Sequence, residues 1–144
     1  MIEKDTVKLL RECDAGVKMG VESITQVVDH VKDERFRRIL ADCRSEHEKL
    51  DREIDSLLNK YEDEGKDPNP IAKGMSWLKT NVMLDMKDKD CTVADLMTDG
   101  CNMGVKSLNR YLNKYEAADE KSKDITKRLI NLEEKLAIDI REWL

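Results

Sequence analysis

Apolar residues recur at alternating steps of three and four through most of the chain, which is the spacing of one buried helix face. The first two stripes consist of Leu10, Cys13, Val17, Gly20, Ile24, Val27 and Val31, and then of Phe36, Leu40, Cys43, His47, Leu50, Ile54, Leu57 and Tyr61. They predict helices over residues 6–31 and 33–62, with Asp5 or Thr6 as the first N-cap and Asp33 as the second. Because almost no loop separates these helices, they must run antiparallel.

The second half of the chain carries two further stripes of the same kind. They consist of Ala94, Met97, Cys101, Gly104, Leu108, Tyr111 and Tyr115, and then of Ile125, Leu129, Leu132, Leu136, Ile140 and Trp143. Thr92 and Asp95 resemble a capping box, so we predict helices over 92–116 and 119–143. Between the halves, a proline break and a shorter apolar stripe predict a crossover helix over 70–86.

A segment of nine residues returns 84 positions later in the chain. Residues 16–24 read GVKMGVESI and residues 100–108 read GCNMGVKSL, so six of the nine positions match or exchange one aliphatic residue for another. In the second helix of each half, Asp33-Glu34 returns as Asp119-Glu120, at an offset of 86. We interpret the chain as a duplicated helix pair whose second interhelical loop is two residues longer.

The predicted organisation is one all-α domain over 1–144, with a helix pair over 5–62, a crossover with its short helix over 63–91 and a helix pair over 92–144. A crossover of this length must travel along the bundle, which gives an up-down-down-up four-helix bundle. The repeat, the crossover and the Gly-x-x-Met-Gly-Val echo resemble the ferritin-like superfamily. The closer resemblance is to a bacterial branch of small stand-alone bundles that have an extra crossover helix and no established activity.

The resemblance raises the expectation of a metal centre, since ferritin-like di-iron proteins hold two metals with one Glu and one Glu-x-x-His from each helix pair. This chain lacks most of those ligands. Val17 and Cys101 stand at the inward glutamate positions, Arg44 precedes His47 by three residues, and the last helix contains no histidine. We therefore expect no di-iron centre, no cofactor and no enzymatic activity.

Counting residues outward from each interhelical turn places Cys43, His47, Cys101 and Glu133 within one or two turns of one another, near the middle of the bundle. One interpretation is a mononuclear metal or redox site, because Cys43 and His47 have an i, i+4 spacing that can bind zinc. The other is a core histidine that hydrogen-bonds Glu133 or a backbone carbonyl, with the cysteines as small apolar residues. We favour the second interpretation, because buried polar groups are normally satisfied locally.

Four glycines, Gly16, Gly20, Gly100 and Gly104, lie inside predicted helices. Each costs about 0.5–1 kcal/mol relative to alanine, so a gain elsewhere must offset them. We predict a helix-packing role in which Gly16 and Gly20 face Gly100 and Gly104 at a close helix–helix contact. The alternative is a surface patch for another chain.

Composition narrows the classes of function. The net charge of −5 and the pI near 5.2 argue against partners that are nucleic acids or anionic membranes, which require a basic surface. No apolar run suits a signal peptide or a membrane span, and the four cysteines lack CxxC spacing, so we expect a cytoplasmic protein with reduced thiols.

The function expected from the sequence is that of a non-enzymatic bundle which binds a protein partner, a second copy of itself or a small apolar ligand. The alternative is a metal- or thiol-based redox or stress protein descended from a di-iron ancestor. No GxSxG, P-loop or Ser/His/Asp pattern supports an enzyme.

Overall fold

The computed structural model describes residues 3–61 and 89–144, and this part of the chain is helical and contains no strand. Its elements are α1 (Lys4–Val28), α2 (Glu34–Lys60), α4 (Lys89–Lys114), α5 (Glu120–Ile140) and a short 3-10 helix, η1 (Arg141–Trp143). The all-α prediction and its four long helices are confirmed, with ends shifted by up to three residues. The predicted crossover helix over 70–86 lies outside the described residues.

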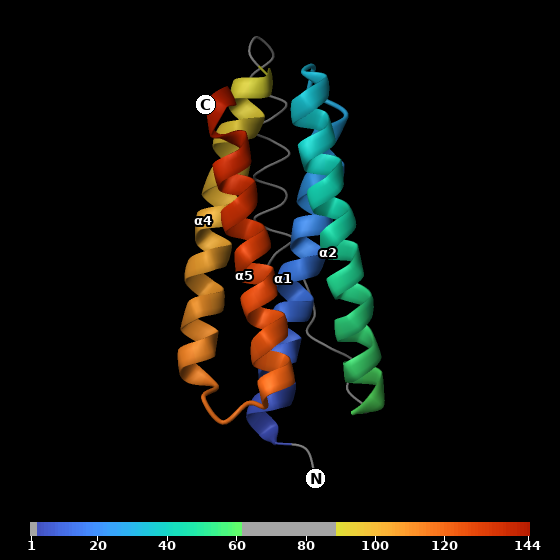
Figure 1. Ribbon diagram of the computed structural model, residues 1–144, viewed down its shortest axis with the longest axis vertical. Coiled ribbons are helices and arrows are strands. Elements are labelled where there is room, and N and C mark those ends of the chain that lie inside the picture. Colours follow the sequence, from blue (N-terminus) through green and yellow to red (C-terminus); the bar gives the residue numbers. More distant parts are fainter. Residues whose placement is uncertain (1–2, 62–88) are drawn as a thin grey trace.

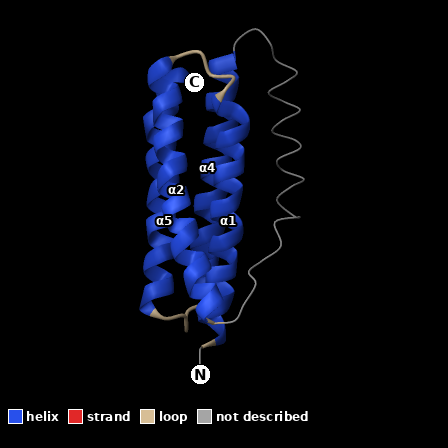
Figure 2. Ribbon diagram, turned by 90° about the vertical axis from the view of Figure 1, so that its right-hand side faces the viewer, coloured by secondary structure: helices blue, strands red, loops and turns tan. Residues whose placement is uncertain are grey.

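The four helices lie side by side in an elongated bundle (Figure 1), in which α1 and α5 run in one direction and α2 and α4 in the other. Figure 2 shows α2 and α5 on one side of the bundle and α1 and α4 on the other. Each helix contacts its two neighbours, so contacts join α1 to α2, α2 to α5, α5 to α4 and α4 to α1. Of the two diagonal pairs, α1 and α5 are in contact, whereas α2 and α4 are not. The α1–α5 contact is close, because Cys13 Sγ lies 3.1 Å from Thr126 Oγ1.

An aspartate caps the second helix of each pair. Asp33 is the N-cap of α2 and accepts the Phe36 N–H at 3.0 Å, as the sequence predicts. Asp119 is the N-cap of α5 and accepts the Ser122 N–H at 2.8 Å. Each cap satisfies a backbone N–H that the first turn of a helix leaves without a partner.

The first helix starts differently from the prediction. Its N-cap is Glu3, which makes no side-chain capping bond, so neither Asp5 nor Thr6 caps α1. Instead, the Asp5 carboxylate accepts the Ala117 N–H at 3.1 Å, and Thr6 Oγ1 accepts the Asp119 N–H at 2.8 Å. These side chains therefore serve the loop between α4 and α5, a partner that periodicity along the chain could not reveal.

The start of α4 makes a similar connection at the opposite end of the bundle. The Asp90 carboxylate accepts the Lys32 N–H at 2.7 Å and the Asp33 N–H at 3.0 Å, which ties α4 to the loop between α1 and α2. Since α4 already includes Lys89, Thr92 lies inside the helix, and the prediction that it begins a capping box is wrong.

The apolar core consists of two clusters, one towards each end of the bundle. One contains Ile24, Cys43, Cys101 and Leu136, and the other contains Val17, Leu50, Leu108 and Leu129, each with further apolar neighbours. In the chain, the residues midway between these members are Gly20, His47, Gly104 and Glu133. A polar layer therefore separates the two clusters. No helix in the described part of the chain combines the length and the apolar content needed to cross a membrane.

Candidate functional site

The centre of the polar layer is His47, which projects from α2 and is 1% exposed. Its Nδ1 lies 2.8 Å from the carbonyl oxygen of Cys43, and its Nε2 lies 3.0 Å from Glu133 Oε1 on α5. A carbonyl oxygen can only accept, so Nδ1 carries a proton and donates it. The predicted hydrogen-bonded core histidine is confirmed, and both of the expected partners are present.

The surroundings of the ring favour its charged form. Burial by itself lowers the pKa of His47, but hydrogen bonds to Cys43 and Glu133 and the negative charge of Glu133 outweigh this effect and raise the pKa to about 10. At neutral pH the imidazolium therefore donates from both nitrogens, to the Cys43 carbonyl and to the Glu133 carboxylate. The buried charge is thus paired and hydrogen-bonded, as buried charges generally are.

The other two candidates, Cys43 and Cys101, also lie beside this pair. Cys43 Sγ is 3.5 Å from His47 Nδ1, and Cys101 lies close enough to Glu133 for the carboxylate to affect its thiol. Burial, together with the neighbouring Glu133 charge, raises the pKa of Cys101, so this thiol stays protonated. The prediction that the four side chains cluster is therefore confirmed.

This cluster is not arranged to bind one metal ion. Cys43 Sγ lies beside Nδ1 of His47, whereas Glu133 lies beside Nε2, on the opposite side of the ring. Across residues 3–61 and 89–144, no three ligand atoms of this cluster lie within 4.8 Å of one another. Nε2, the nitrogen that would have to bind a metal, already donates to Glu133.

Gly20 makes room for the histidine ring. A Cβ atom at Gly20 would lie 2.6 Å from Cδ2 and 2.8 Å from Nε2 of His47, closer than real Cβ contacts. A Cβ atom at Gly104 would lie 3.5 Å from Cδ of Glu133, which is an ordinary contact. Each glycine thus lies beside one member of the central pair, within its own helix pair.

The prediction that Gly16 and Gly20 face Gly100 and Gly104 is therefore wrong. A Cβ at Gly100 would meet nothing within 4 Å, and a Cβ at Gly16 would meet Leu129 Cδ2 of α5 at 3.7 Å. The physical reason is that Gly16, Gly20 and Gly104 lie beside side chains of α2 and α5, and not beside the backbone of the other glycine-bearing helix.

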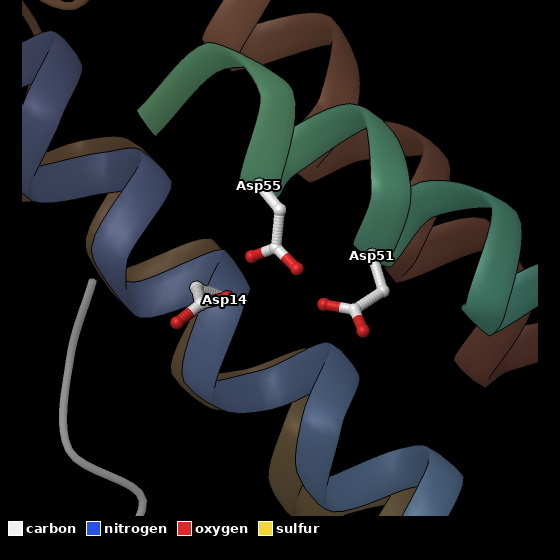
Figure 3. Close-up of side chains that lie close together, drawn as sticks. All are labelled: Asp14, Asp51 and Asp55. Carbon is white, nitrogen blue, oxygen red and sulfur yellow. The ribbon is translucent and has the colours of Figure 1, made fainter. Parts of the chain in front are cut away.

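A second polar cluster was not predicted from the sequence. Lys18 Nζ donates to carboxylates of Asp14, Asp51 and Asp55, at 2.8 Å for Asp51 and 3.0 Å for Asp55. Figure 3 shows the three aspartates converging between α1 and α2. The only signal in the sequence is one i, i+4 pair on each helix, Asp14 with Lys18 on α1 and Asp51 with Asp55 on α2. Charged residues at this spacing usually lie on a solvated helix face, so the pairs did not indicate a cluster.

The ammonium group of Lys18 occupies the centre of this second cluster. Burial lowers the pKa of Lys18, but the hydrogen-bonded carboxylates of Asp14, Asp51 and Asp55 raise it by more, so the side chain stays charged. Burial raises the pKa of Asp14, whose side chain is only 5% exposed, and the Lys18 ammonium opposes that rise. The cluster is therefore a partly exposed ion-pair network that joins α1 to α2.

A shallow surface hollow lies between α4 and α5. It is lined by Asn102, Val105, Lys106, Glu134, Ala137 and Ile138. Ile138 is 53% exposed, which makes it one of the few large apolar side chains open to solvent in the described part of the chain.

Comparisons of the chain with protein-family models, with curated proteins and with solved structures find no match. Any assignment of function therefore depends on the geometry of this chain. That geometry provides two polar clusters, and in each of them the charged groups already pair with one another.

Proposed function

We propose that this protein is a non-enzymatic, ferritin-like helical bundle in which an internal ion pair replaces the metal centre, and that it acts by binding a protein partner. The observation that carries this proposal is the pair formed by His47 and Glu133 at the middle of the bundle, 3.0 Å apart. Both ring nitrogens are already hydrogen-bonded. A resident metal would have to displace a satisfied buried pair, which is costly.

Contacts in the polar layer support the duplication on which the ferritin-like interpretation rests. Gly20 and Gly104 are 84 residues apart, and His47 and Glu133 are 86 residues apart, which are the two offsets of the sequence repeat. In space, Gly20 lies beside His47 and Gly104 lies beside Glu133. Corresponding residues of the two helix pairs thus have corresponding neighbours.

The ends of the bundle support the same interpretation. The bond from the Asp119 N–H to Thr6 corresponds to the bond from the Asp33 N–H to Asp90. Thr6 and Asp90 differ by 84 positions, and Asp33 and Asp119 differ by 86. An up-down-down-up arrangement with an approximate two-fold axis through the polar layer would produce both bonds.

A binding role suits the surface better than the interior, because the central charges are already paired. The lining of the hollow between α4 and α5 combines the exposed Ile138 with the charged residues Lys106 and Glu134, and protein interfaces commonly combine apolar and charged side chains in this way. We infer a protein partner that inserts an apolar side chain there. The expectation of a cytoplasmic protein agrees with this role.

Metal analysis of the untagged protein, combined with imidazole NMR, tests the proposal. We expect well under one metal ion per chain and a His47 ring with protons on both nitrogens at pH 7, a signature that Glu133→Gln should weaken. Stoichiometric iron, manganese or zinc, lost in His47→Leu, would instead favour the metal-based redox alternative.

A further inference from the structure

The two members of the central pair come from different helix pairs. His47 belongs to α2 in the first pair and Glu133 to α5 in the second, and they meet where α2 packs on α5. Their side chains are 1% and 13% exposed, so the contact is buried at the interface between the two pairs. Because the two residues correspond across the repeat, two different side chains occupy equivalent positions at this interface.

We propose that the His47–Glu133 contact specifies how the helix pairs associate, so that the first pair docks on the second and not on another copy of itself. A pairing of two first halves in the same geometry would place two histidines in contact, and a pairing of two second halves would place two glutamates in contact. The observed combination is the one that joins unlike charges.

The energetic basis is the cost of burying like charges. A buried ion pair contributes little net stability, but removing its compensation is expensive, so such pairs select among alternative arrangements. A single buried polar position can select partner and register in this way in coiled coils. The α2–α5 contact also includes ion pairs from Arg128 and Lys121 to Glu53, but these side chains are 29–59% exposed, and partly exposed pairs contribute little. The buried part of the contact is otherwise apolar, with Leu40, Leu50 and Leu136, and apolar contacts discriminate poorly between similar partners.

The glycines of the polar layer leave room for either orientation of the pair. Gly20 provides the space that the His47 ring occupies, and Gly104 provides an equivalent space beside Glu133. An exchange of the two side chains should therefore fit, with the imidazole beside Gly104 and the carboxylate beside Gly20. This expectation rests on the duplication included in the proposed function.

A charge-swap series in the full chain tests the inference. The single variants His47→Glu and Glu133→His place like groups in contact, and the double variant His47→Glu/Glu133→His restores an unlike pair. We expect each single variant to lower the urea midpoint by about 1–2 M and to increase the fraction of dimer or larger species. The double variant should recover at least half of the lost midpoint and the wild-type mass in light scattering. Glu46→His, an exposed change next to His47 in the chain, should leave both measurements nearly unchanged.

Each outcome decides the question. A double variant no more stable than the worse single variant, or single variants indistinguishable from wild type, would overturn the inference. If the single variants are insoluble, the double variant still decides: recovery of soluble protein supports the inference and its loss refutes it. A bound metal in the wild type would refute the proposed function, and that result is measured separately from the swap.

Discussion

Gly20→Ala should destabilise the protein, although alanine is the better helix former. The added Cβ would lie 2.6 Å from Cδ2 of His47, and the ring cannot move freely to avoid it. The ring is 1% exposed, and hydrogen bonds to the Cys43 carbonyl and to Glu133 hold its two nitrogens. Any displacement that relieves the clash must therefore lengthen at least one of these bonds.

The expected magnitude combines opposing terms. Alanine in place of glycine gains about 0.8–1 kcal/mol of helix propensity. Overpacking a well-filled core costs about 1–3 kcal/mol, and weakening a buried hydrogen bond costs about 1–3 kcal/mol more. The cost exceeds the gain, so the free energy of unfolding should fall by about 1–5 kcal/mol.

Urea unfolding followed by circular dichroism measures this change, with two matched controls. Gly104→Ala meets Glu133 at 3.5 Å, an ordinary contact, and Gly100→Ala meets nothing, so both should be neutral or stabilising by up to about 1 kcal/mol. In a His47→Ala background the clash disappears, and Gly20→Ala should become stabilising. A Gly20→Ala protein as stable as Gly104→Ala would refute the reasoning.

Three further predictions concern the ion pairs. Because the folded pKa of His47 is raised from 6.5 to about 10, its contribution is fully present below pH 6.5 and is lost as pH rises towards 10. Between pH 6.5 and 8.5, the free energy of unfolding of the wild type should therefore fall more steeply than that of His47→Leu, by up to about 1.4 kcal/mol per pH unit. In thermal melts at pH 7, Glu133→Leu isolates a ring that is 1% exposed and should cost about 1–3 kcal/mol, whereas His47→Leu isolates the less buried Glu133 carboxylate, which is 13% exposed, and should cost less; equal costs would contradict this. Lys18→Met leaves the buried Asp14 facing two further carboxylates and should lower the urea midpoint, whereas Lys49→Met, which removes an exposed pair, should change stability by no more than about 0.5 kcal/mol.

The helices could be predicted because their signals are local. Apolar spacing locates the four described helices within a few residues, and Asp33 caps α2 through a bond that spans only three residues. The pairing of His47 with Glu133 could also be predicted, since an antiparallel helix pair fixes how far each residue lies from its turn. Distance along a helix axis is thus encoded in the residue count.

The direction in which each helix face points could not be obtained in this way. Gly16 faces α5 and Gly20 faces His47, because α1 is rotated towards α2 and α5, and no count along the chain measures that rotation. The Lys18 cluster was missed for the same reason. Its aspartates become partners only when the polar edges of α1 and α2 are brought together, and the sequence shows those edges as two separate charged faces.

The polar layer also affects how the bundle moves. Each apolar cluster contains side chains from all four helices, and the charged pair lies between the clusters. Fraying that begins at one end can expose one cluster and stop at the pair, since breaking that pair would isolate a buried charge. Amide hydrogen exchange should then show two zones that open independently, with the slowest exchange in the helix turns around His47.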